Sequence, residues 1–532
     1  MQVAEVQRLF GRYREALGAS EWSDMCEAFS RDLPSTFWAH PRRRVHTWVA
    51  DRLRVDGHAL APIPYVEGGY QSDQASKWGR RFEFRAGLIH LQEAASMLPP
   101  LILKPKPGEW VLDLCAAPGG KSAQLALQME NTGTLVVNDL SFDRLRALRA
   151  TQERLGLRNM VLCAQRGETL LRDHPPVFDK VLVDAPCSCE GTLRRRGRWS
   201  FEQYNEQFKR QLIDTQRALL WRALCLTRPG GRVVYSTCTL DPEENEGVVA
   251  ATLETWARHR AQGSTHLAIS LETIDVPHLK TSSGLTSWRG VRWSDELSQS
   301  ARVYPHHNDT GGFFLASFRL SEDPLWDPRV ARQSWRPLEV LPSQERARLS
   351  GWTRTSYGID LPQPSALSLF RGNTRSVSAS SVDLHTPPTR YQAAGLPMFY
   401  TRGAVPRLTS AAALEWGGLA KTGVCELETT EQVDRYYRGA TQYIDRSQVC
   451  LSNDLDGVEV DVALTQVKSV RGIYIVRYRG VGIGMGSLSE ERESLHEGPS
   501  SPCLLKSEYP KRIRLTDERS AFESPNPQAI DR

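Results

Sequence analysis

Short apolar runs alternate with segments of helical spacing through the middle of the chain. The apolar runs lie at 110–114, 134–138, 160–163, 178–183 and 231–236, and the helical segments lie from about 122, at 141–155 and at 211–226. Strands that alternate with helices are typical of a parallel sheet with helices on both faces. This pattern predicts a doubly wound, Rossmann-like α/β core, with 312–320 as a late strand of the same sheet.

The segments on either side of this core have weaker patterns. Residues 87–103 predict a helix that Pro99 and Pro100 stop, and the Ser-, Thr- and Pro-rich stretch 371–389 is typical of a linker. Strand-like runs reappear near 458–464 and 472–486. We therefore expect an N-terminal α+β extension at 1–100, the core at 101–322, a linker at 323–390, a β-rich domain at 391–515 and a disordered tail at 516–532.

Composition narrows the class of protein. The chain has 532 residues, of which 40% are apolar and 24% charged, as in globular proteins with a full core. No apolar run approaches the ~20 residues that cross a bilayer, so we expect no membrane partner. The ten cysteines form no paired CxxC knuckles, which predicts reduced thiols and no metal site. The net charge of +5 is too small to identify a polyanionic partner by itself.

The N-terminus carries Glu5 and Glu15 and lacks the apolar segment of a secretory signal. It is amphipathic and contains Arg8, Arg12 and Arg14, which leaves a mitochondrial presequence open. We expect a monomer in the nucleus or the cytoplasm, with the mitochondrion as an alternative.

A turn of small residues joins the first core strand to the first core helix. It reads Cys115-Ala116-Ala117-Pro118-Gly119-Gly120-Lys121, and the second strand ends in Asp139, twenty residues after Gly119. Small residues let the backbone approach a ligand, a helix N-terminus offers free N–H groups, and an acid at Asp139 accepts hydrogen bonds from ribose hydroxyls. A Walker A loop is excluded because it requires glycine where Cys115 stands. The pattern predicts a nucleotide-type site, with an ordinary tight turn as the alternative.

Two cysteines and one carboxylate follow two other core strands. The fourth strand runs into Asp184 and Cys187, and the fifth runs into Cys238. We expect these side chains to converge, because the carboxyl ends of central parallel strands share one edge of the sheet. A thiolate that adds to C6 of cytosine makes C5 reactive towards an electrophilic methyl group, and a carboxylic acid at N3 stabilises the adduct. The alternative is that both cysteines are buried small apolar residues.

These motifs resemble those of the Nop/Sun (NSUN-type) RNA cytosine-5 methyltransferases. The similarity rests on CAAPGGK at 115–121, ND at 138–139, DAPCS at 184–188, STCTLDPEENE at 236–246, LQEAASMLPP at 91–100 and PHHNDTGGFF at 305–314. It extends from about residue 30 to 320, and the last of these segments looks closest to the eukaryotic tRNA-modifying branch. The segments 482–486 and 504–515 faintly resemble a PUA-like RNA-binding module.

The resemblance implies a class I methyltransferase that uses S-adenosylmethionine to methylate C5 of cytosine in RNA. Residues 115–121 would bind the cofactor, with Asp139 on its ribose hydroxyls, and Asp184 would lie between cofactor and base and bind N3. Cys238 would be the nucleophile that attacks C6, and Cys187 would assist product release.

Two residues depart from the family pattern. Cys189 replaces a glycine in the usual PCSGDGT segment, at a position where glycine would allow φ > 0. Gln165 follows the third strand, where the family usually has an acid near the adenine. Lys121 would orient Asp184 or add charge near the base.

A DNA cytosine-5 methyltransferase and a catalytically weak RNA-binding assembly factor with the same fold are the alternatives. The Pro-Cys thiol is the nucleophile in the DNA enzymes, which need no second Thr-Cys, so Cys238 favours RNA. We expect tRNA as the substrate, with rRNA as the alternative. The run Arg194–Arg198 is expected to contact phosphates, and Trp78 or Trp199 to stack on bases, although a structural role for both tryptophans stays open.

Overall fold

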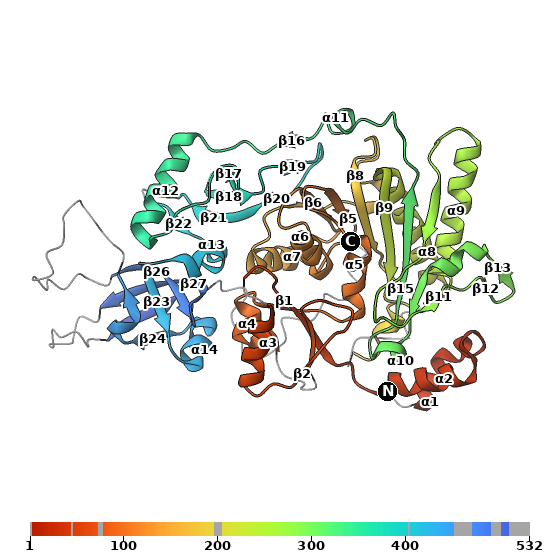
Figure 1. Ribbon diagram of the computed structural model, residues 1–532, viewed down its shortest axis with the longest axis horizontal. Helices are drawn as coiled ribbons and strands as arrows, with labels where there is room; N and C mark the ends of the chain where they lie inside the picture. Colours follow the sequence, from red (N-terminus) through yellow and green to blue (C-terminus); the bar gives the residue numbers. More distant parts are fainter. Residues whose placement is uncertain are drawn as a thin grey trace, which may run out of the picture.

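The structure is a computed structural model of the chain, and it describes residues 3–43, 46–72, 78–195, 205–373, 375–402, 405–451, 471–490 and 502–509. Figure 1 shows a central sheet flanked by helices, with the N-terminal elements at the bottom of the view and the C-terminal elements on the left. Within the described residues, no helix has both the length and the apolar composition that a membrane span requires.

The central sheet has ten strands in the order β11-β14-β15-β9-β8-β5-β6-β7-β20, with β10 paired to β15. The parallel strands are β5 (Trp110–Asp113), β6 (Thr134–Asn138), β7 (Met160–Cys163), β8 (Phe178–Asp184) and β9 (Thr227–Thr237). The antiparallel strands are β10 (Ile269–Glu272), β11 (Ser282–Ser283), β14 (Ala301–Val303), β15 (Phe313–Leu320) and β20 (Ala393–Ala394). The predicted α/β core and its late strand are confirmed.

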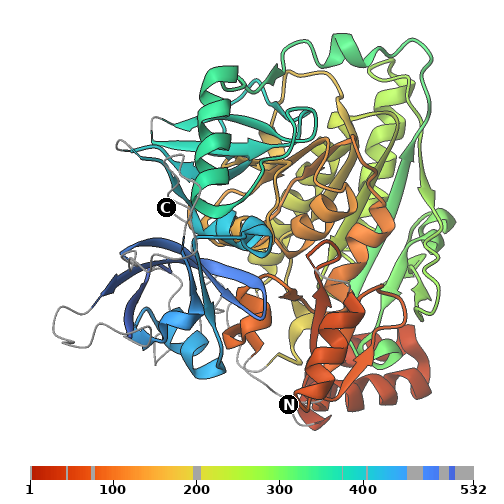
Figure 2. The same ribbon diagram turned by 60° about the vertical axis from the view of Figure 1, so that its left-hand side comes forward.

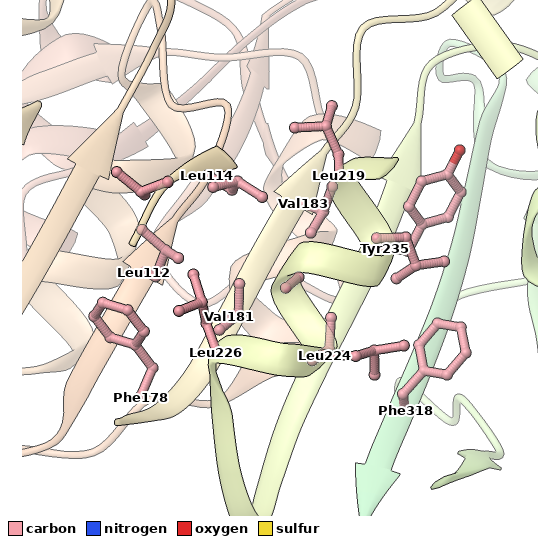
Figure 3. Close-up of a cluster of buried hydrophobic side chains, with 14 of the residues drawn as sticks. Leu112, Leu114, Phe178, Val181, Val183, Leu219, Leu224, Leu226, Tyr235 and Phe318 are labelled. Carbon is pink, nitrogen blue, oxygen red and sulfur yellow. The ribbon is translucent and has the colours of Figure 1, made fainter. Parts of the chain in front are cut away.

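Successive strand residues point to opposite sides of the sheet, and apolar side chains lie on both of them. Helices cover both faces. They are α5 (Leu98–Leu103), α6 (Gly120–Gln128), α7 (Phe142–Leu155), α8 (Glu206–Leu226) and α9 (Glu246–Ala261). Leu112 packs in the same cluster as Leu219 of α8 (Figure 3), whereas its neighbour Val111 packs in the cluster that holds Leu125 of α6 and Leu145 of α7. A one-residue slip of any strand would exchange these two cores, so burial fixes the strand register.

The N-terminal extension is α+β, with a four-stranded sheet in the order β2-β3-β1-β4. Its elements are α1 (Val3–Phe10), α2 (Arg14–Ser30), β1 (Ser35–Ala39), α3 (His46–Val55), β2 (Leu60–Pro62), β3 (Gly69–Ser72), α4 (Phe82–Arg85) and β4 (Ile89–Leu91). The predicted helix at 87–103 is confirmed only for its second half, residues 95–103, and it does not stop at the two prolines. Residues 89–91 pair with β1, and Pro99 and Pro100 lie in the first turn of α5, where a missing N–H costs nothing.

The expected linker at 323–390 is wrong, because it carries regular structure. It contains α11 (Pro328–Ala331), β16 (Arg336–Pro337), α12 (Ser343–Tyr357), β17 (Ser368–Asn373), β18 (Ser376–Ser380) and β19 (His385–Thr386). β17 and β18 form a sheet with β21 (Leu396–Tyr400) and β22 (Arg407–Leu408), which crosses the boundary expected at 391. Every residue of β18 is buried, and its small serine and alanine side chains gave the segment the composition of a linker.

The last domain carries a six-stranded sheet in the order β24-β28-β27-β26-β23-β25. Its elements are α13 (Ser410–Trp416), β23 (Val424–Leu427), α14 (Thr430–Arg438), β24 (Thr441–Ile444), β25 (Val449–Cys450), β26 (Gly472–Tyr478), β27 (Val481–Glu490) and β28 (Cys503–Ser507). The β-rich character is confirmed, and the likeness to a PUA module stays a prediction. The expected strand at 458–464 and the tail at 516–532 lie outside the described residues.

The C-terminal half packs against the N-terminal sheet and pairs with the central sheet. Phe37 and Ile89 of the N-terminal sheet share one buried cluster with Tyr437 and Tyr478 of the last domain. The segment before β21 pairs with the edge of the central sheet through β20, where Ala393 lies opposite Leu162. Figure 2 shows the last domain packed beside the N-terminal sheet. The three parts therefore form a continuous body around the central sheet.

A buried ion pair links α9 to β14 behind the end of β9. The Arg302 side chain is 1% exposed and that of Glu246 0%, and the guanidinium Nε lies 2.6 Å from the Glu246 carboxylate. Arg302 also donates to the backbone oxygen of Leu240, two residues after Cys238. The segment 236–246, which resembles a family motif, therefore ends in Glu246, and this residue forms a buried ion pair with Arg302.

We expect Arg302→Met to lower the free energy of unfolding by about 3–5 kcal/mol, because it leaves the Glu246 carboxylate buried without its partner. Urea unfolding followed by tryptophan fluorescence measures this loss. Arg292→Met is the matched control, since the Arg292–Asp295 pair is exposed and surface ion pairs contribute little. Equal stability of the two variants would contradict the assignment.

Candidate active site

The predicted thiols and carboxylate meet at the carboxyl ends of β8 and β9. These strands are parallel neighbours, and Asp184 lies opposite Ser236 in their register. Cys238 directly follows β9, and Cys187 lies three residues after Asp184. The two sulfur atoms are 3.4 Å apart. The sheet therefore brings together the three side chains that the sequence analysis singled out.

Asp184 is held from two sides. Nζ of Lys121 donates to one carboxylate oxygen at 2.7 Å, and Oγ of Ser236 donates to the other at 2.9 Å. Lys121 also donates to Oγ of Ser96 at 2.7 Å, so its ammonium lies between Ser96 and the end of β8. The Asp184 side chain remains 29% exposed, so its carboxylate is oriented but still accessible to a ligand.

Cys189 is a third thiol at the same place. Its sulfur lies within 4.8 Å of those of Cys187 and Cys238 and contacts the backbone oxygen of Cys187 at 3.3 Å. This position has a left-handed conformation, with φ 60°. The φ > 0 geometry that glycine would allow is therefore present although Cys189 stands here, and three sulfurs lie at the carboxyl ends of β8 and β9.

Contact among the three thiols separates their pKa values. Hydrogen bonds from Cys187 and Cys238 hold the pKa of Cys189 well below its usual range. Hydrogen bonds to Cys189 and to Cys238, together with burial, raise the pKa of Cys187. The hydrogen bond with Cys187 lowers the pKa of Cys238, but the one with Cys189 and burial raise it further, so the net shift is upward. The contacts within the cluster therefore shift the pKa of Cys189 in the opposite direction from those of Cys187 and Cys238.

The loop that carries Cys187 is braced by residues that the sequence analysis missed. The buried Glu244 carboxylate accepts hydrogen bonds from the Ser188 amide at 3.0 Å and from the Gln216 side chain at 2.9 Å, and burial raises its pKa to about 7. At the far end of the loop, Tyr13 donates to Glu190 at 2.6 Å. Glu244 lies in the family-like PEENE segment, which is the one sequence signal that pointed to it.

The small residues of the 115–121 turn are required by close packing. Gly119 has φ 105°, and a Cβ there would lie 2.9 Å from the Leu148 side chain. A Cβ at Gly120 would lie 3.0 Å from Oε1 of Gln92. The turn opens helix α6, whose first N–H groups face the end of β5. We call this tightly packed turn the glycine cradle, because larger residues at Gly119 and Gly120 would collide with Leu148 and Gln92.

Asp139 closes this cradle at the end of β6. Its carboxylate accepts hydrogen bonds from the Ala117 amide at 3.2 Å and the Ser141 amide at 3.0 Å, and burial raises its pKa. At the end of β5, Oδ1 of Asp113 is buried without a hydrogen-bond partner among the described residues, and burial raises the pKa of this carboxyl to about 7. A glycine cradle with carboxylates at two adjacent strand ends fits a ligand that carries a ribose and a cationic centre.

Two other predicted contacts turn out differently. Arg194 is buried and bonded to the backbone oxygen of Thr310 and to Asp309, so the expectation that it contacts phosphates is wrong. Trp78 is 2% exposed and packs in the core, which confirms its structural alternative rather than base stacking. The amide of Gln165 holds the backbone oxygen of Arg390 at 2.8 Å. Residues 196–200, which include Trp199, lie outside the described residues.

The doubly wound sheet with this turn, the strand-end acid and the rim of thiols defines a methyltransferase of the α/β class. Residues 100–319 match the profile of the family described as 16S rRNA methyltransferase RsmB/F. The tRNA (cytosine(49)-C(5))-methyltransferase of Pyrococcus abyssi is 35% identical over 56% of this chain and 95% of its own length. The chain therefore belongs to the RsmB/F, or Nop/Sun, family of S-adenosylmethionine-dependent RNA cytosine-5 methyltransferases, which confirms the resemblance, the enzyme class and the cofactor.

Two further comparisons set the extent of the similarity. The ribosomal RNA small subunit methyltransferase F of Shewanella loihica is 28% identical over 87% of this chain and 90% of its own length. A crystal structure of a methyltransferase homolog from Pyrococcus horikoshii is 32% identical, has a TM-score of 0.51 and covers 60% of this chain and 98% of its own. The similarity to the former protein thus extends into the C-terminal half.

We expect Cys189 to be alkylated by iodoacetamide at a lower pH than Cys187 or Cys238, because the thiolate is the reactive form. In Cys189→Gly, the reaction of Cys238 should begin at a lower pH than in the parent, since the hydrogen bond that raises its pKa is lost. Peptide-resolved mass spectrometry measures both series, with the exposed Cys450 as an internal reference. An unchanged Cys238 profile in the variant would show that the two sulfurs do not interact.

Proposed function

We propose that this protein methylates C5 of a cytosine in small-subunit ribosomal RNA through a covalent bond between Cys238 and C6 of the base. The observation that carries the proposal is the 3.4 Å distance between the sulfurs of Cys187 and Cys238, beside the carboxylate of Asp184. Two thiols and an acid on one rim match the needs of cytosine, whose C5 becomes nucleophilic after C6 is attacked.

Each side chain has a distinct part in this reaction. As the Cys238 sulfur bonds to C6, its thiol proton passes to N3 through the Asp184 carboxylate, which the Lys121 ammonium holds at 2.7 Å. Residues 115–121 and Asp139 would hold S-adenosylmethionine, which would supply the electrophilic methyl group. The C5 proton must then be removed so that the C5–C6 double bond forms again, the S–C6 bond breaks, and the N3 proton returns to Cys238. The sulfur of Cys187 lies 3.4 Å from that of Cys238, and we assign its thiolate form to the removal of the C5 proton.

The choice of ribosomal RNA rests on the C-terminal half of the chain. The Shewanella protein, named a ribosomal RNA small subunit methyltransferase, is similar over 87% of this chain, whereas the Pyrococcus tRNA enzyme matches 56% of it. The additional domains pack against the N-terminal sheet and add a strand to the catalytic sheet. They would therefore present RNA in a fixed orientation to the rim. tRNA remains the second candidate, because the higher identity, 35%, is to the tRNA enzyme.

We expect Cys238→Ala to abolish methyl transfer, because the C6 adduct cannot form. Cys187→Ala should form the adduct and release it slowly, so that a protein–RNA complex survives denaturing electrophoresis. Cys225→Ala, a substitution on α8 away from the rim, is the matched control and should do neither. A stable adduct in Cys238→Ala together with normal turnover in Cys187→Ala would exchange the two roles.

We expect kcat/KM for methyl transfer to be at least about tenfold higher on small-subunit ribosomal RNA than on a tRNA pool, which corresponds to ~1.4 kcal/mol. Radiolabelled S-adenosylmethionine measures the rates, with Cys238→Ala as the blank, and bisulfite sequencing locates the modified base. A higher kcat/KM on tRNA would replace ribosomal RNA by the second candidate and leave the chemistry intact.

A further inference from the structure

Two adjacent histidines face one carboxylate at the junction of the N-terminal helices and the catalytic domain. His306 and His307 lie on α10 (Pro305–Asn308), and Glu21 lies on α2. The two histidine side chains are 6% and 0% exposed. Nε2 of His306 is 3.9 Å from one oxygen of Glu21, and Nε2 of His307 is 3.6 Å from the other. One nitrogen from each ring and one carboxylate oxygen all lie within 4.8 Å of one another.

These buried nitrogens have no hydrogen-bond partner. Both ring nitrogens of His306 and both of His307 are without one among the described residues, and the distances to Glu21 are too long for hydrogen bonds. Buried polar atoms in native structures are nearly always paired, so four unpaired nitrogens in two adjacent rings require an explanation. The two rings are packed edge to face, with their centroids 4.4 Å apart, and this packing holds them in place.

The groups that meet here form a mixed nitrogen and oxygen donor set, with two imidazole rings facing one carboxylate. Neutral imidazole and carboxylate are both ligands of divalent transition-metal ions. The ammonium of Lys280 lies 3.9 Å from Glu21 and partly balances its charge.

We propose that Glu21, His306 and His307 bind a divalent transition-metal ion of the zinc type. Bonds of about 2.0–2.2 Å from histidine nitrogen and carboxylate oxygen to Zn²⁺ imply ligand atoms roughly 3.3–3.5 Å apart in a tetrahedron. The observed 3.6 and 3.9 Å are slightly wider, so small side-chain movements close the site. Two imidazoles favour Zn²⁺, Co²⁺, Ni²⁺ or Cu²⁺ over Mg²⁺ and Ca²⁺. The expectation of no metal rested on cysteine spacing, which carries no information about this cluster.

The site clamps the N-terminal helices to the loop that carries the catalytic thiols. The residues that follow α10 hold Arg194 through the backbone oxygen of Thr310, and Arg194 in turn donates to the backbone oxygen of Asp32, just after α2. Gly312 then donates to the backbone oxygen of Gly191, at the end of the Cys187 loop, at 2.9 Å. A metal ion between α2 and α10 therefore stabilises this loop without contacting the RNA base.

Titration of the chelator-treated full-length protein with Co²⁺ tests the site, because its visible spectrum reports the ligands. We expect one Co²⁺ per chain without a cobalt–thiolate charge-transfer band. In Glu21→Gln and in the double variant His306→Ala/His307→Ala, affinity should fall by about a hundredfold or more. His266→Ala is the matched control, since this exposed histidine pairs with Asp323 and is not at the site. The Glu21 side chain is 39% exposed, so we expect Glu21→Gln to fold. This variant therefore tests the site even if the double histidine variant does not fold.

The three thiols of the catalytic rim are the competing ligands for the same ion. A strong thiolate band that disappears in Cys189→Ser but persists in Glu21→Gln would place the metal at the rim and overturn the proposal, as would the absence of stoichiometric binding. The expected result also includes a higher melting temperature of the parent protein with Zn²⁺, and no such rise in Glu21→Gln. These readouts do not depend on methyl transfer, so they stand apart from the outcome for the proposed function.

Discussion

The parallel pairing of β8 with β9 is the constraint on which the site depends. The register sets Asp184 opposite Ser236, and the loops that leave the two strands bring the sulfurs of Cys187 and Cys238 to 3.4 Å. Alternate strand residues bury into separate layers above and below the sheet, so a slip of one residue would exchange both cores. Apolar packing on the two faces of the sheet therefore fixes the positions of these side chains.

Several charged groups and three thiols lie close together at the carboxyl ends of β8 and β9, which form the rim of the site. Lys121 and Ser236 both donate to Asp184. These hydrogen bonds stabilise the negative charge of the carboxylate and leave the side chain partly exposed. Hydrogen bonds within the thiol cluster lower the pKa of Cys189, whereas the net shift of the Cys238 pKa is upward. In the proposed reaction, Cys238 would therefore have to give up its proton as it attacks the base.

The sequence predicted the elements that depend on local periodicity and the residues that directly follow a strand. Five apolar runs predicted the five parallel strands, and the positions of Asp184, Cys187 and Cys238 after two of those strands predicted that these side chains meet. Contacts between distant segments were not predictable, such as Glu244 with Gln216 or Tyr13 with Glu190, since nothing local encodes them. The same holds for Arg194, whose arginine-rich surroundings suggested an exposed, RNA-facing residue, although its partners come from segments far away in the chain.

Cys189 shows how the chain tolerates a side chain in the left-handed conformation that glycine adopts most readily. A non-glycine residue in the left-handed conformation costs roughly 1–2 kcal/mol. At this position the sulfur contacts the backbone oxygen of Cys187, and the next residues are held by Tyr13 and by the Gly191–Gly312 hydrogen bond. Tyr13, which lies between α1 and α2, and the segment after α10 thus brace the loop in the conformation that glycine adopts most readily. It follows that the N-terminal extension is part of what positions the thiols at the ends of β8 and β9.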